Sequence, residues 1–205
     1  MSRPSFSASF SSGPPSLVFQ QFLLNDWQNS ARFPGSSPLS EDRKMATCIN
    51  DQFVKSQCYC LNEQTSNQFT NTFVGDHTLG VHSDSDEQLI IHLAFVQTFR
   101  LSGLTLGVMG DGTCPCTIKM FANQPSLGFS DASDTVPTQQ LVVKGGEDGQ
   151  PTVLKVDLQA AKWQRADSIT LFIEDNHGAE STFLHSIKVF GVPVHGTNVA
   201  EISSG

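Results

Sequence analysis

A strict alternation of side chains near the middle of the chain most limits what this sequence can fold into. The apolar series is Leu89, Ile91, Leu93 and Phe95, and the residues between them are Gln88, Ile90, His92 and Ala94. A period of two is typical of a β-strand that buries one face in a hydrophobic core. This segment is therefore predicted to be a core strand, with His92 on its outward face.

Further strands are predicted along the rest of the chain, separated by glycine-rich and Asn/Asp-rich turns. Their predicted ranges are Arg100–Val108, Thr117–Phe121, Gln139–Val143, Val153–Leu158, Ser168–Glu174 and Phe183–Phe190. Turn signals follow at residues 110–112, 145–149 and 176–178. Because no long amphipathic helical pattern interrupts this series, the expected fold class is all-β, an antiparallel β-sandwich or jelly roll.

The first 44 residues differ in kind from the remainder. They hold eleven serines and five of the ten prolines, with four basic and three acidic residues. Such a composition buries too little apolar surface to offset chain entropy, so residues 1–44 are predicted to be disordered. The folded domain is expected at residues 45–198, followed by a short flexible tail at 199–205. A Ser-rich, acid-poor opening also resembles an organelle transit peptide, and that alternative stays open.

Charge excludes several classes of partner. The formal net charge is −8 with a pI near 5.0, and the twelve basic residues are scattered. Contacts to nucleic-acid phosphates and to anionic membranes need clustered Lys and Arg, so neither partner is expected. The sequence also lacks an apolar run of the roughly 20 residues needed to span a bilayer.

The five cysteines are expected to be free thiols in a reducing compartment. They are Cys48, Cys58, Cys60, Cys114 and Cys116. The Cys-x-Cys spacing is too tight for a relaxed disulfide within a pair. With no secretory signal expected, the cytosol or nucleus is the simplest location. Four of these thiolates could together bind zinc, but Cys-x-Cys is not the usual zinc spacing, and no metal is expected.

Asp84, Asp86 and Glu87 form the densest acidic cluster of the sequence. With Asp76 they could bind calcium through carboxylate oxygens. The favoured interpretation is a solvated turn in which Asp and Ser side chains accept backbone N–H bonds ahead of the core strand.

No catalytic motif is present. The sequence lacks Gly-x-Ser-x-Gly and the paired-histidine helix motif of metalloproteases, and no Cys-x-x-Cys suggests redox chemistry. We therefore expect no enzyme activity and no cofactor, although a dispersed Ser-His-Asp triad would leave no local signature.

Several segments, in order, resemble the PITH domain family, the C-terminal module of thioredoxin-like proteins that associate with the proteasome. The similar segments are Cys58-Tyr59-Cys60-Leu61-Asn62-Glu63, the stretch Ser83–Ile91, the stretch Thr117–Pro125, the stretch Ser168–Asn176 and Gly191-Val192-Pro193-Val194. The resemblance covers about residues 58–198.

This resemblance implies a galactose-binding-like jelly roll without known catalysis, which associates with the proteasome regulatory particle in cytoplasm and nucleus. A monomer is expected. Five residues of the first two segments are candidates for a protein contact or a structural turn: Asn62, Glu63, Asp84, Asp86 and Glu87. The alternative is a carbohydrate- or small-ligand-binding sandwich, for which the aromatic side chains available to stack on a sugar are Trp27, Trp163 and Tyr59.

Overall fold

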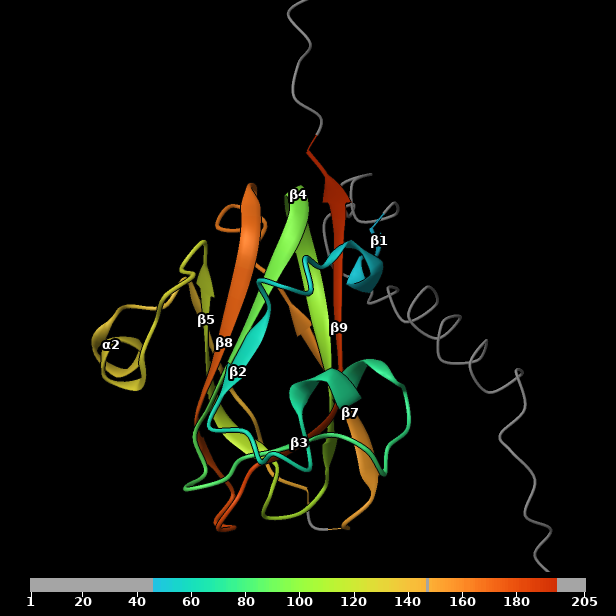
Figure 1. Ribbon diagram of the computed structural model, residues 1–205, viewed down its shortest axis with the longest axis vertical. Coiled ribbons are helices and arrows are strands. Elements are labelled where there is room, and N and C mark those ends of the chain that lie inside the picture. Colours follow the sequence, from blue (N-terminus) through green and yellow to red (C-terminus); the bar gives the residue numbers. More distant parts are fainter. Residues whose placement is uncertain (1–45, 147, 195–205) are drawn as a thin grey trace, which may run out of the picture. The chain divides into compact units, whose positions relative to one another are not determined.

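Nine antiparallel strands form the framework of the described residues, 46–146 and 148–194, in the computed structural model (Figure 1). They are β1 Thr47–Cys48, β2 Tyr59–Leu61, β3 Val81–His82, β4 Leu89–Met109, β5 Pro115–Ala122, β6 Gln139–Val142, β7 Pro151–Asp157, β8 Ala166–Asn176 and β9 Phe183–Pro193. The short helices are η2 Asn50–Gln52, η3 Phe69–Phe73 and α2 Phe129–Asp134. The segment predicted to be disordered, 1–44, the domain limits at 45 and 198, and the tail at 199–205 lie outside the described residues.

Strand β4 organises the fold because it belongs to both layers of a sandwich. Its 21 residues would span about 70 Å if straight, at ~3.3 Å per residue, roughly twice the length of the eleven-residue β8 and β9. The first part of β4 pairs with β8 and the second part with β9, and the register shifts between Ala94 and Phe99. Figure 1 shows the two green limbs of β4 meeting beside its label.

The register places both ends of β4 at the same end of the domain. Leu89 pairs with Ile173 near the end of β8, and Val108 pairs with Leu184 near the start of β9. Because residues 177–182 connect β8 directly to β9, these pairs lie close to one another. One layer therefore contains β2, the first part of β4, β8, β5 and β6, and the other contains β7, the second part of β4, and β9 with β1 and β3.

The main core lies between the two layers. Leu89, Ile91 and Leu93 pack there, as the alternation predicts, together with inward-facing residues of β5, β8 and β9. Trp163 is fully buried in the same cluster, and its indole Nε1 donates to Oε1 of Gln139 at 3.2 Å. The antiparallel sandwich expected from the sequence is thus confirmed.

The outer face of the first layer is also covered, which the alternation does not reveal. Ile90, Phe121 and Phe172 form a second apolar cluster with Leu127 and with Ala132 of α2. His92 lies on this outer face but is only 2 % exposed, because the ring of Tyr59 stacks on it at 5.0 Å.

The predicted strands match β4 to β9, with one difference. The segments expected as two strands, 88–95 and 100–108, are a single bent strand in the structure. In the described part of the chain, no helix has the length and apolar character needed to cross a membrane.

Candidate functional site

One end of the sandwich, here called the loop end, gathers most of the residues that the sequence singled out. It consists of residues 62–67, 76–88, 110–114, 143–150 without residue 147, and 176–182. These segments connect strands at the end where β4 starts and finishes. The two motifs of the sequence, 58–63 and 83–91, meet here because β2 pairs with the first residues of β4, Leu61 opposite Ile90.

Asn62 fixes the acidic turn. Its side-chain amide donates to Oδ1 of Asp86 at 2.8 Å, to the carbonyl of Gln88 at 2.7 Å and to the carbonyl of Asp86 at 3.3 Å. Its Oδ1 accepts from the backbone N–H of Ser85 at 3.0 Å, and its own carbonyl accepts from the N–H of Asp84 at 2.9 Å. Asn62 has a φ of 66°, a left-handed conformation that Asn tolerates better than most residues.

Glu63 and Asp86 also accept backbone hydrogen bonds. Oε2 of Glu63 accepts from the N–H of Phe69 at 2.5 Å, at the start of η3, and Glu63 forms an isolated bridge with Ser83. Oδ1 of Asp86 accepts from the N–H of Gln88 at 3.0 Å, immediately before β4. Both carboxylates therefore organise local backbone, in the manner expected of acidic turn residues.

The remaining two candidates, Asp84 and Glu87, have a different environment. Asp84 is exposed and Glu87 is half-buried. Among the described residues, neither carboxylate accepts a hydrogen bond or forms an ion pair, although the backbone carbonyl of Glu87 accepts from Oγ1 of Thr182 at 2.7 Å. The carboxylates of Asp84 and Glu87 thus remain available to a partner, while hydrogen bonds with Asn62 and Thr182 hold the backbone of the turn.

The loop end as a whole is strongly acidic. Its described residues include eight acidic side chains, Glu63, Asp76, Asp84, Asp86, Glu87, Asp111, Asp148 and Glu180, against the single basic residue Lys144. Clustered charge of one sign raises the local potential and favours a partner of opposite sign. The charge of the loop end is therefore suited to contact a basic surface on a partner.

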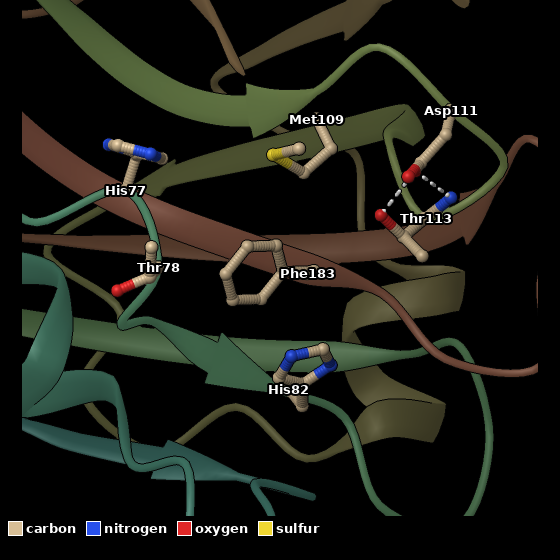
Figure 2. Close-up of a pocket in the computed structure, with 7 residues that line it drawn as sticks. All are labelled: His77, Thr78, His82, Met109, Asp111, Thr113 and Phe183. Carbon is tan, nitrogen blue, oxygen red and sulfur yellow. Dashed lines mark hydrogen bonds between the residues drawn. The ribbon is translucent and has the colours of Figure 1, made fainter. Parts of the chain in front are cut away.

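A pocket of about 350 Å³ opens at the same end (Figure 2). Its lining residues are His77, Thr78, His82, Met109, Asp111, Thr113 and Phe183. Figure 2 shows Phe183 between Met109 and His82, with His77 and Thr78 on one side and Asp111 and Thr113 on the other. No pattern in the sequence indicates this pocket, since its walls come from the segment before β3, β3 itself, the end of β4, the loop before β5, and β9.

The polar groups of the pocket are arranged around an aromatic pair. The ring of His82 stacks on that of Phe183, with centroids 4.3 Å apart and planes inclined at 24°. Burial lowers the pKa of His82 below its usual value, which favours the neutral ring at neutral pH. Oδ1 of Asp111 accepts from both the hydroxyl and the N–H of Thr113, at 2.6 and 2.9 Å.

The structure places the two Cys-x-Cys pairs apart, one around the start of β2 and the other around the start of β5, and all five cysteines are free. Burial raises the pKa of Cys60, and it also raises the pKa of Cys114 to about 11, with Asp111 and Cys116 adding to the rise. Within residues 46–146 and 148–194, no group of three or more His, Cys, Asp or Glu side chains is placed to hold a metal ion. That search includes the acidic turn and Asp76.

The aromatic residues considered for sugar stacking do not provide a free platform in the described part of the chain. Trp163 is fully buried. The ring of Tyr59 stacks on His92, and its hydroxyl donates to the carbonyl of Pro125 at 2.9 Å. Trp27 lies outside the described residues.

Comparison with known proteins supports the resemblance seen in the sequence. The model of the PITH domain matches residues 40–204, which include both motifs that meet at the loop end. The chain belongs to the PITH domain family.

This PITH domain is similar to two relatives, and the match covers a different share of each. It is 32% identical to Thioredoxin-like protein 1 of Schizosaccharomyces pombe over 164 residues, a match that covers 78% of this chain but 54% of the relative. It is 25% identical to the PITH domain-containing protein CG6153 of Drosophila melanogaster, covering 71% of each. The chain thus spans about half the length of the first relative and most of the second.

Solved structures match the fold of this PITH domain at low sequence identity. The CBM32-1 and CBM32-2 domains of Clostridium perfringens ZmpB match with a TM-score of 0.50 and 12% identity, over 82% of this chain and 38% of theirs. CpGH89 of the same organism matches with a TM-score of 0.50 and 14% identity, over 72% of this chain and 15% of its own. These likenesses identify a galactose-binding-like β-sandwich, and they concern the fold alone.

Proposed function

We propose that this PITH domain is a non-enzymatic interaction module that associates with the regulatory particle of the proteasome, in cytoplasm and nucleus. The partner and location are those that the family resemblance implies. The observation that carries the proposal of a contact surface is the availability of the Asp84 and Glu87 carboxylates on the turn that Asn62 fixes.

A preformed charged turn suits protein recognition for an energetic reason. Binding through a flexible loop costs the free energy needed to order that loop. Here Asn62 and Asp86 hold the turn through hydrogen bonds within the chain, so that cost is reduced. Exposed interfacial charges of this kind mainly increase the association rate and its dependence on salt.

The carbohydrate-binding alternative has less support from this geometry. The sandwich fold is shared with sugar-binding domains, but a shared fold does not imply a shared ligand. The described aromatic candidates, Tyr59 and Trp163, are stacked or buried.

The proposal is tested with the double variant Asp84→Asn/Glu87→Gln in the tagged full-length protein. Co-purification of regulatory-particle subunits should fall severalfold, with the largest difference from wild type at low salt. The matched control is Asp148→Asn/Glu180→Gln, which removes the same charge from other loops of the loop end. The urea midpoint of both variants should stay close to that of wild type. Equal loss of co-purification in the two variants, or no loss in either, would contradict a contact at the acidic turn.

A further inference from the structure

The pocket at the loop end has a chemistry that the acidic turn does not explain. We propose that it receives the guanidinium group of an arginine side chain from a partner protein. This inference rests on the proposed function as an interaction module, and it specifies one anchor of the interface.

The walls of the pocket suit a long side chain with a flat head. Phe183, Met109 and His82 provide apolar and aromatic surface. Arginine has an apolar stem and a planar cation that stacks on aromatic rings, which a lysine ammonium does less well. A volume of about 350 Å³ is at the small end of the ~300–1,000 Å³ range of ligand pockets, a size appropriate to one side chain.

The hydrogen-bonding groups of the pocket include an unused carboxylate oxygen. Both hydrogen bonds to Asp111 end on Oδ1, and Oδ2 receives none from the described residues. The hydroxyl of Thr113 donates to Asp111, and that of Thr78 donates to Asp76, so both retain acceptor capacity. Among the described residues, no Lys or Arg lines the pocket. A ligand rich in N–H donors and positively charged therefore complements it.

The surroundings favour the same occupant. The acidic residues of the loop end attract a basic segment, and exposed apolar side chains adjoin the pocket along the chain. Leu79, next to Thr78, is 42 % exposed, and Phe73 and Val74 precede it at 38 % and 64 %. Arginine is enriched among interface hot spots, and the fully buried centre of an interface is more apolar than its rim. The segment of the partner is thus expected to carry an arginine next to apolar residues.

The test uses Nα-acetyl-arginine amide as the probe and nuclear magnetic resonance of the full-length protein as the readout. The methyl signal of Met109 and the ring signals of Phe183 should shift saturably. Nα-acetyl-citrulline amide, which keeps the shape but lacks the charge, should bind about tenfold more weakly, since a hydrogen bond to a charged group is worth more than a neutral one.

Asp111→Asn provides the decisive variant, because it retains Oδ1 for Thr113 and removes the charge. It should weaken binding of the arginine probe about tenfold. Asp148→Asn is the matched control: Asp148 also accepts a turn N–H, from Gln150, but does not line the pocket. It should change the affinity less than twofold.

Three outcomes would overturn the proposal. One is equal binding of the arginine and citrulline probes, and another is an Asp111→Asn variant that binds like wild type. The third is the absence of a saturable shift when the arginine probe is added to tens of millimolar. This outcome overturns the proposal whether or not galactose, added as a second probe, produces a shift. Asp84→Asn/Glu87→Gln should change probe affinity less than about twofold, since neither residue lines the pocket. A failure of the proteasome association and a failure of the arginine pocket therefore give different results.

Discussion

The side-chain amide of Asn62 donates to the carboxylate of Asp86 at 2.8 Å, across 24 positions of sequence. This bond joins the two motifs of the sequence, 58–63 and 83–91. It also fixes the turn from which the available carboxylates of Asp84 and Glu87 project.

Replacing Asn62 should destabilise the domain. Asn62→Ala removes its side-chain hydrogen bonds, each worth about 0.5–1.5 kcal/mol net, and places Ala at a φ of 66°. We expect the free energy of unfolding to fall by about 2–4 kcal/mol in urea denaturation. Asn62→Gly should lose less, since Gly adopts positive φ without strain. An Ala variant within about 0.5 kcal/mol of wild type would show that the turn does not depend on Asn62.

Gly80 lies immediately before β3 and allows this segment to pack closely against Leu184 and Phe183, beside the pocket. A Cβ atom at this position would lie 2.2 Å from the carbonyl oxygen of Leu184 and 2.5 Å from Cε2 of Phe183. Gly80→Ala should therefore reduce the free energy of unfolding by about 1–3 kcal/mol, as overpacking does. Gly112→Ala is the control, because its Cβ would make ordinary contacts of 3.4 Å or more. If both variants unfold at the same urea concentration, a Cβ atom at position 80 does not destabilise the domain, which would contradict the close packing against Leu184.

Three histidines, two of them buried and His82 half-buried, should make the domain less stable in mild acid. Burial lowers the pKa of His92, His82 and His185 below the usual value of about 6.5. Above that value these rings are neutral in both states. As the pH falls below it, the unfolded chain binds protons that the folded chain resists, so the free energy of unfolding decreases until the lowered pKa values are passed.

The pH effect can be measured by urea denaturation between about pH 7.5 and pH 5. His92→Gln should reduce the loss of stability over this interval, because it removes one of the buried titrating rings. His77→Gln, at an exposed position, is the control. A stability that does not change over the interval would contradict the burial of these rings.

The cysteines should differ in reactivity. The thiolate is the reactive form, and burial raises the pKa of Cys60 and of Cys114, the latter to about 11. At neutral pH, iodoacetamide should therefore modify the exposed Cys48 before either of these two. Mass spectrometry after denaturation without reductant should find all five thiols free. Native alkylation of Cys60 or Cys114 as fast as Cys48 would be inconsistent with this packing.

The local pattern of the sequence was sufficient to predict strands β4 to β9, but not the short strands β1, β2 and β3. Alternation identifies Leu89–Phe95 and the later strands because each side chain's direction follows from its position along an extended backbone. It did not predict that 88–95 and 100–108 form one bent strand. That outcome depends on which neighbours each half of β4 pairs with, β8 or β9, and those neighbours lie some 80 residues away.

The sequence named Asn62, Glu63, Asp84, Asp86 and Glu87 as candidates for a protein contact or a structural turn. That Asn62 and the acidic turn lie together is seen only in the tertiary structure. Composition could not separate Asp86, whose Oδ1 is bonded within the chain, from Asp84, whose carboxylate is available to a partner. All are acidic or amide side chains near one turn, and their roles differ by a few ångströms of geometry.

The sequence by itself determined the sandwich fold and the family. Strand periodicity and the order of motifs depend only on neighbouring positions along the chain, so they can be read without the tertiary structure. What only the tertiary structure decided is the pocket around Phe183. His82, Met109, Asp111 and Phe183 reach it from segments that touch because β3 and β4 both pair with β9. Contacts between distant segments depend on strand pairing across the sheet, and no local pattern of residues encodes them.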